Sequence, residues 1–259
     1  MTRRQKIRKA IILISFLLFP ITINYFSPYI IIDGASQGII AGSFITFALL
    51  FIVSLFLGRA WCGWVCPGAG IQEWCFTVND KKARGGRLNW IKYFIWIPWI
   101  SIIIIMAILA EGFHTVNPLH LTETGISVSE PAAYLMYFTI VGLFVILPFT
   151  AGKRAFCHYV CWMAPFMIIG TKIKNYFKWP SLHLESTSDK CKQCKICDKN
   201  CPMSLEVSKI IKSSSMENVE CILCGICIDN CPNGVIKYSW KRKKTSPVAT
   251  PDCPNTMID

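Results

Sequence analysis

Four long stretches without a charged residue constrain the fold of this 259-residue chain more than any other feature. A helix needs about 20 predominantly apolar residues to cross a hydrocarbon core of about 30 Å. The stretches contain 23, 25, 18 and 22 residues, and a hydrophobic fraction of 53% agrees with a membrane protein. We therefore expect four transmembrane helices: Ala10–Ile32, Gly34–Gly58, Tyr93–Ala110 and Pro131–Gly152.

All 27 Lys and Arg residues lie on one side of these stretches. None occurs between the first two stretches, or from Glu111 to Ala132. Cytoplasmic loops of membrane proteins carry an excess of Lys and Arg, so both termini are predicted to be cytoplasmic in a multi-pass plasma-membrane protein. The net charge of +12 reflects this topology and requires no nucleic acid. The outer loops carry only acids: Asp33, Glu111, Glu123 and Glu130.

The first stretch also has features of a secretory signal, because basic residues precede the apolar run Ile11–Phe19. No small-residue cleavage site follows that run closely, so an uncleaved anchor is predicted. Pro20 should kink this helix without preventing the span.

Two cysteine runs follow the last apolar stretch, 30 residues apart. Each has the spacing Cys-x2-Cys-x2-Cys-x3-Cys-Pro, typical of bacterial-type [4Fe–4S] ferredoxins, in which the fourth thiolate ligates the other cluster. Zinc sites use cysteine pairs separated by longer loops, and a cytoplasmic location disfavours disulfides. The predicted ligands are Cys191, Cys194, Cys197 and Cys231 for the first cluster, and Cys201, Cys221, Cys224 and Cys227 for the second.

Another pattern occurs twice, where the second and fourth apolar stretches end. Residues 58–67 and 152–162 both contain Arg-Ala-aromatic-Cys-x-aromatic-Val-Cys, 95 residues apart. Two parallel repeats about an axis along the membrane normal would bring these turns together. The apolar segments after the turns, Ala60–Gln72 and Ala155–Thr171, are too short or interrupted to span and are expected to be interfacial or re-entrant.

The four thiols of these turns have three interpretations. They could hold a further iron–sulfur cluster shared between the repeats, take part in thiol–disulfide exchange, or serve only as small buried residues. The spacing alone does not choose among them. The residues concerned are Cys62, Cys66, Cys157 and Cys161.

Composition predicts the remaining boundaries. The membrane domain covers residues 1–171, a polar linker residues 172–187, a small α+β two-cluster ferredoxin domain residues 188–240, and a basic tail residues 241–259. The ferredoxin segment offers little hydrophobic core, so cluster ligation must supply much of its folding energy. Lysines near the first motif would raise its potential or attract an acidic partner: Lys190, Lys192, Lys195 and Lys199.

The outer loop between the third and fourth stretches contains Glu111, His114 and His120. Quinol oxidation needs a group that accepts protons, and histidine with glutamate suits this role. A polar loop without such a role is the plainer interpretation.

Taken together, these motifs resemble the NapH family of membrane ferredoxin-type proteins, the membrane subunits of quinol dehydrogenases, and the related membrane region of NosR. Those proteins combine four or more transmembrane helices, two Cys-x3-Cys-Pro turns at cytoplasmic helix ends, and a C-terminal pair of [4Fe–4S] motifs. Residues 62–67 match the first turn, whereas Trp162 stands where the second turn of the family has proline. The resemblance implies electron transfer between a quinol pool and a partner redox protein.

The predicted protein is therefore an α-helical membrane protein, with four transmembrane helices in two repeats and a ferredoxin domain. It is expected to relay single electrons through two [4Fe–4S] clusters, between quinol or a membrane subunit and a redox partner. One alternative is a membrane redox sensor or assembly factor with structural clusters. Another is a metal or thiol reductase that uses the turn cysteines.

Overall fold

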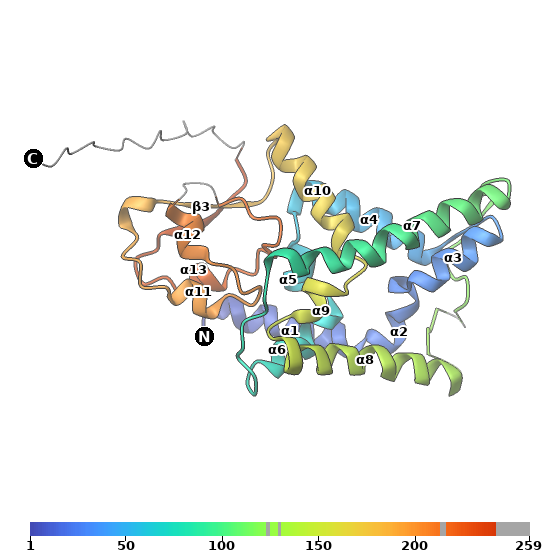
Figure 1. The fold of residues 1–259 in the computed structure, drawn as a ribbon, viewed down its shortest axis with the longest axis horizontal. Helices are drawn as coiled ribbons and strands as arrows, with labels where there is room; N and C mark the ends of the chain where they lie inside the picture. Colours follow the sequence, from blue (N-terminus) through green and yellow to red (C-terminus); the bar gives the residue numbers. More distant parts are fainter. Residues whose placement is uncertain (123–124, 129–130, 213–215, 242–259) are drawn as a thin grey trace, which may run out of the picture.

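The computed structural model describes residues 1–122, 125–128, 131–212 and 216–241. Figure 1 shows the long helices α4 (Gly42–Leu57), α7 (Ile91–Leu109) and α8 (Pro131–Ala151) extending away from a small unit at one end of the molecule. The N-terminal helix α1 (Arg3–Leu17) begins beside that unit (Figure 1). The outer acids Glu123 and Glu130, and the predicted tail from residue 242 on, lie outside the described residues.

Two helices in the described part of the chain are long and apolar enough to cross a membrane, Gly86–Leu109 and Ala133–Ala151. A third span results if the helical segments Arg3–Leu17 and Phe19–Phe26, bent by 57°, count as one. Helix α4 is apolar but shorter, at 16 residues. The expectation of four full spans is thus met for two helices by length and composition, and the four-span arrangement stays a prediction.

The first predicted span is divided in the structure. After α1 the chain forms a single turn α2 (Phe19–Thr22), a 3₁₀ turn η1 (Ile23–Phe26) and a separate helix α3 (Pro28–Ser36). A proline occupies one of the first two positions of α2 and of α3, where the missing backbone N–H costs least. Neither proline could lie inside a continuous preceding helix without removing one of the backbone hydrogen bonds of that helix. The predicted kink at Pro20 is therefore a larger break.

The second predicted span begins later than expected. Gly34 lies in α3, and a short strand β1 (Ile39–Ala41) precedes α4. This strand pairs in parallel with β2 (Thr115–Asn117), which ties the two outer loops together. Gly38 turns the chain between α3 and β1 with a φ of +67°, a conformation that favours glycine.

Each cysteine turn folds as a short helix followed by a proline-initiated helix. The first turn forms α5 (Ala60–Trp64) and α6 (Pro67–Cys75), and the second forms α9 (Ala155–Tyr159) and α10 (Ala164–Phe177). The second cysteine of each turn donates its backbone N–H to the aromatic residue five positions earlier, Cys66 to Trp61 at 3.0 Å and Cys161 to Phe156 at 2.9 Å. The 95-residue sequence repeat thus recurs as a repeated backbone conformation.

The small unit combines an antiparallel pair of strands, β3 (His183–Ser186) and β4 (Ile236–Ser239), with three short helices. These are α11 (Ile196–Asn200), α12 (Val207–Lys212) and α13 (Ile226–Asp229); 3₁₀ turns occur at η2 (Gly86–Trp90) before α7 and at η3 (Ser188–Lys190). The predicted linker, residues 172–187, contains the end of α10 and strand β3. Trp179 anchors it by donating to the Leu55 carbonyl at 2.7 Å.

Candidate metal centre

The two predicted ligand sets each border one cavity of the small unit. One cavity is bordered by Cys191, Cys194, Cys197 and Cys231, and another by Cys201, Cys221, Cys224 and Cys227. In the described part of the chain, no three His, Cys, Asp or Glu side chains meet closely enough to hold a single metal ion. A four-iron cubane spreads its thiolates over four corners, and the assignment of the eight cysteines to two such clusters stays a prediction.

The two motifs differ at the residue after their second cysteine. Lys195 and Gly225 both adopt a positive φ, 57° and 76°, at the start of α11 and α13. A Cβ on Gly225 would lie 2.6 Å from the Tyr238 hydroxyl, which donates to the Leu223 carbonyl at 2.6 Å. Glycine in the second motif therefore makes room for a covering tyrosine, whereas the exposed lysine of the first motif faces solvent.

The four turn thiols are buried together. Their residues are 4–7% exposed, and three of them line one apolar cavity with Phe144 and Phe156. The fourth, Cys62, has its Sγ 3.8 Å from Met167 Sδ. The thiols in the cavity wall are Cys66, Cys157 and Cys161.

Burial makes these thiols poor nucleophiles. It raises the pKa of Cys66 well above the ordinary value, and negative charge on Cys62, Cys157 or Cys161 would raise it further. Burial likewise raises the pKa of Cys62, although Arg59 and Arg154 oppose that rise. Reactive cysteines are typically low-pKa and accessible, so this environment favours neutral thiols or ligands of a metal group over thiol exchange.

The second cluster motif packs directly on the turns. Ile222 and Cys224 belong to the same buried apolar cluster as the four turn thiols. Trp64 Nε1 donates to the Leu223 carbonyl at 3.0 Å. A Cβ on Gly63 would lie only 2.3 Å from the Ile222 carbonyl oxygen, so the contact depends on glycine there. Cys201, at the end of the first cysteine run, packs against the same apolar cluster, so both runs reach the turns.

A buried ionic group supports the first turn. Arg8 contacts both carboxylate oxygens of Glu73, at 2.9 and 2.6 Å, and Arg154 contacts the same carboxylate. Arg8 also donates to the Gly63 carbonyl at 2.9 Å, and Arg154 to the Cys62 carbonyl at 2.7 Å. Burial alone would raise the pKa of Glu73, but Arg154 and Arg8 hold it below its ordinary value.

A second buried ionic group joins the membrane helices to the cluster unit. Arg59 and Lys92 each contact Glu220 at 2.5 Å. Burial would raise the pKa of Glu220, but these two cations lower it to about 2. Near the N-terminus, Arg4 contacts Asp229 at 2.7 Å, and Gln5 donates to the Cys224 carbonyl at 3.0 Å. Charged contacts therefore surround the apolar contact between the two parts.

Replacing Glu73 by glutamine is expected to lower the free energy of unfolding by about 3–5 kcal/mol, because two buried arginines would lose their shared carboxylate. Thermal unfolding of the full chain in detergent measures this change. Glu206 provides the control, since it and its partner Lys209 are 62% and 74% exposed, and the loss of a pair screened by solvent should change stability far less. Equal effects of Glu73→Gln and Glu206→Gln would contradict the structural role of the buried group.

The two outer-loop histidines have partners other than Glu111 in the described part of the chain, and the proton-accepting site there stays a prediction. His120 Nε2 lies 2.7 Å from Asp33 Oδ2, and His114 Nε2 lies 3.0 Å from the Ala110 carbonyl. His158, between the cysteines of the second turn, is buried, with Nδ1 3.1 Å from Asn89 Oδ1. Burial lowers the pKa of His158 to about 4, so it is neutral at pH 7.

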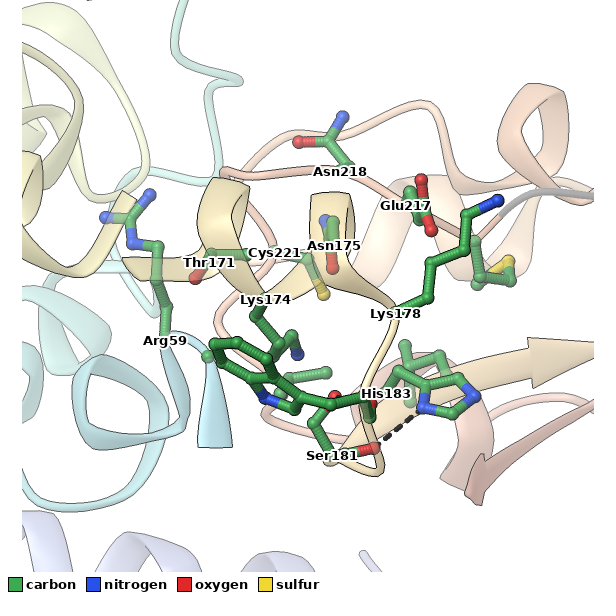
Figure 2. Close-up of a pocket in the computed structure, with 15 residues that line it drawn as sticks. Arg59, Thr171, Lys174, Asn175, Lys178, Ser181, His183, Glu217, Asn218 and Cys221 are labelled. Carbon is green, nitrogen blue, oxygen red and sulfur yellow. Dashed lines mark hydrogen bonds between the residues drawn. The ribbon is translucent and has the colours of Figure 1, made fainter. Parts of the chain in front are cut away.

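A polar pocket lies on another side of the second motif (Figure 2). Lys174 and Asn175 of α10 line it, together with His183 of β3 and Cys221. His183 Nδ1 donates to the Ser181 carbonyl at 2.8 Å (Figure 2). Hydrogen bonds and polarity around a ligand sulfur tune an iron–sulfur cluster, so Cys221 differs in environment from the apolar-packed Cys224.

Sequence reasoning did not identify the charged residues that contact the turns as functional residues. In the sequence, Arg59 and Arg154 only contribute to the positive-inside pattern, and Glu73 and Glu220 have no assigned role. One signal was available, because the repeat keeps an arginine three residues before the first cysteine of each turn.

Comparisons with known proteins bear on both sets of cysteines. A family model described as a 4Fe-4S binding domain matches residues 40–84 and 132–179, and thus both turns. A model described as a 4Fe-4S dicluster domain matches residues 190–236. The prediction of ferredoxin-type 4Fe–4S domains is confirmed.

Several curated proteins are distant relatives. An uncharacterized protein of Methanocaldococcus jannaschii is 24% identical, over 76% of this chain and 79% of the relative. The putative electron transport protein YccM of Escherichia coli is 24% identical, over 79% of this chain and 57% of YccM. The regulatory protein NosR of Pseudomonas aeruginosa is 28% identical, over 79% of this chain and 30% of NosR. No solved structure matches the chain.

Proposed function

We propose that this iron–sulfur protein is an integral membrane electron-transfer protein, of the NapH kind, that relays single electrons between a quinol pool or membrane partner and a redox partner. The observation that carries the proposal is that Cys224 and the four turn cysteines belong to one buried apolar cluster. A relay needs its redox groups close together and shielded from solvent, and this shared cluster supports a short path between the second motif and the turns.

The proposed ligands of the first and second clusters are the two sets of four cysteines that border separate cavities. The clusters, when bound, supply one-electron chemistry. The chain holds their thiolates, separates them by the short helices α11 and α13, and covers the second motif with Tyr238. These residues set the distance, solvent access and electrostatics of each cluster.

The turn thiols are proposed to hold a further iron–sulfur group. Four cysteines from two parts of the chain are buried side by side, and the 4Fe-4S binding domain model covers both turns. Their burial argues against exchange with a thiol or disulfide substrate, which needs an accessible thiolate. The proposed order is turns, second cluster, first cluster, with flow possible in either direction.

The proposed topology has four spans and cytoplasmic termini. Helices α7 and α8 expose large apolar side chains, including Phe94 and Leu135 at 76% each, as expected of lipid-facing positions. The basic residues all fall on the side of the cluster unit. Helix α4, at about 24 Å, would need local thinning of the bilayer or flanking residues to complete its span.

The far end of the relay is proposed to meet an acidic redox partner. Cys194 is the exposed member of the first set, and the lysines around it are exposed as well. A positive surface around an electron exit steers a negatively charged protein toward it. The lysines are Lys190, Lys192, Lys195 and Lys199.

The test is iron and acid-labile sulfide analysis of the full chain, purified anaerobically, together with electron paramagnetic resonance before and after adding reduced menaquinol. We expect about twelve irons per chain, and about eight when all four turn cysteines are replaced by serine. The control is Cys75→Ser, because Cys75 is buried in α6 outside every predicted ligand set and should leave the iron content unchanged.

Two results would contradict separate parts of the proposal. A wild-type content of about eight irons would remove the group at the turns. Cluster signals that stay oxidised with reduced menaquinol, but respond to dithionite, would remove quinol as the donor.

A further inference from the structure

The surroundings of the turn thiols carry more buried positive than negative charge. Arg8, Arg59, Lys92 and Arg154 are all 0% exposed. They share two buried carboxylates, Glu73 and Glu220. Among these described residues, four cations share two carboxylates, which is an excess of two positive charges, and burial of uncompensated charge is unfavourable.

The unused hydrogen-bond donors lie on two of these four residues. Nε of Arg154, and Nε and one terminal nitrogen of Arg59, are buried without a hydrogen-bond partner among the described residues. Arg8, in contrast, uses Nε on Gln5 and both terminal nitrogens on Glu73. Among the four cations, the nitrogens without a partner therefore lie on the two arginines that the sequence repeat retains; Trp61 Nε1 and His158 Nε2 of the turns also lack one among the described residues.

Both arginines act on the turn thiols. Electrostatic interaction links Arg59 with Cys62, Cys157 and Cys161. Arg154 interacts in the same way with Cys62, Cys66 and Cys157. Arg154 also interacts electrostatically with Cys224, and Arg59 with Cys221, so both arginines act on the second motif as well.

We propose that Arg59 and Arg154 are positioning residues for an anionic iron–sulfur group held by the four turn thiols. The two arginines neutralise the charge of this group, and their free N–H groups donate to its sulfur atoms. The inference rests on the proposed further group at the turns. A [4Fe–4S]²⁺ core with four thiolates carries a charge of about −2, which equals the excess of buried positive charge. Positive charge and hydrogen bonds to sulfur favour the more negative reduced form, so the two arginines raise the reduction potential of the group.

The experiment is a potentiometric titration of the anaerobic full chain, followed by electron paramagnetic resonance, with iron content measured on each sample. Arg59→Gln and Arg154→Gln are each expected to lower the equilibrium constant for one-electron reduction of the turn group at least tenfold, which is 59 mV. Arg59→Lys and Arg154→Lys should restore part of the potential, because they keep the charge but lose donors.

Arg8→Gln is the matched control, since it removes an equally buried charge whose donors are all used. It should shift the potential less than either glutamine variant. Loss of the iron–sulfur group at the turns from the glutamine variants of Arg59 and Arg154, but not from their lysine variants or from Arg8→Gln, would also support the proposal. Loss from all five variants alike would mark a general role in folding and overturn it.

The outcomes separate this inference from the proposed function. About twelve irons in the wild type, with glutamine variants at the wild-type potential, would overturn the inference and leave the turn group standing. About eight irons in the wild type, with no resonance assignable to the turns, would overturn both.

Discussion

Removal of iron from the purified protein is expected to unfold residues 188–240 while the membrane helices stay folded. The cluster unit has a small apolar core: Leu184, Val207, Ile211, Leu223, Val235 and Ile236. Ordering a residue costs about 1–2 kcal/mol of backbone entropy, so six buried side chains stabilise too little structure to order the unit. Ligation of structural metals contributes on the order of 10 kcal/mol in small domains, and a loss of that order is expected here.

Hydrogen–deuterium exchange, read by peptide, measures this effect. Amides of α11 and α13 should exchange slowly in the iron-loaded protein and rapidly after oxidation and chelation, whereas amides of α7 and α8 should be unaffected. Protein treated with chelator but no oxidant, which keeps its iron, is the control. Continued protection of α11 and α13 in iron-free protein would show that the apolar core suffices.

Gly63→Ala is expected to separate the second cluster from the membrane part. Its Cβ would lie 2.3 Å from the Ile222 carbonyl oxygen, which belongs to the backbone and cannot rotate away. Overpacking of this kind costs about 1–3 kcal/mol. The shift of the backbone at Ile222 lengthens the path from the turns to the second motif, so reduction of the two ferredoxin-type clusters by a membrane donor should be slower than in the wild type.

Stopped-flow absorbance of the clusters after mixing with reduced menaquinol measures that rate. Gly142→Ala in α8 is a matched control, because an added Cβ meets nothing within 4 Å. The iron content of both variants should equal that of the wild type. A Gly63→Ala protein that is reduced at the wild-type rate would mean that the contact between turns and cluster unit does not carry the electrons.

The sequence predicts those features of the fold and the site that depend on residues close together in the chain. The cysteine spacing predicts two ligand sets that border two cavities, because four thiols and the residues between them already specify a cluster-binding loop. The repeat around Cys62 and Cys157 likewise indicates that the turns correspond, and the structure buries them together.

Contacts between distant residues could not be predicted in this way. Glu73 lies 65 residues from Arg8, and Glu220 lies 161 residues from Arg59, so no local period relates them. The polar residues Ser36, Gln37 and Gly38 predict a break between the first two apolar stretches, and α3 does end at Ser36. The start of the second stretch at Gly34 is too early, because residues 34–41 carry no charge that would separate them from α4. Pairing of β1 with β2 depends on a strand 76 residues further along the chain.

The contact between Arg4 and Asp229 spans 225 residues of sequence. During synthesis, the first helix therefore enters the membrane long before its partner in the cluster unit exists. Chains emerge at about 5–20 residues per second, so the two ends stay apart for tens of seconds. In the proposed topology, the cysteine turns are then on the cytoplasmic side and uncovered, so we expect any iron–sulfur group at the turns to be inserted before the cluster unit packs on them.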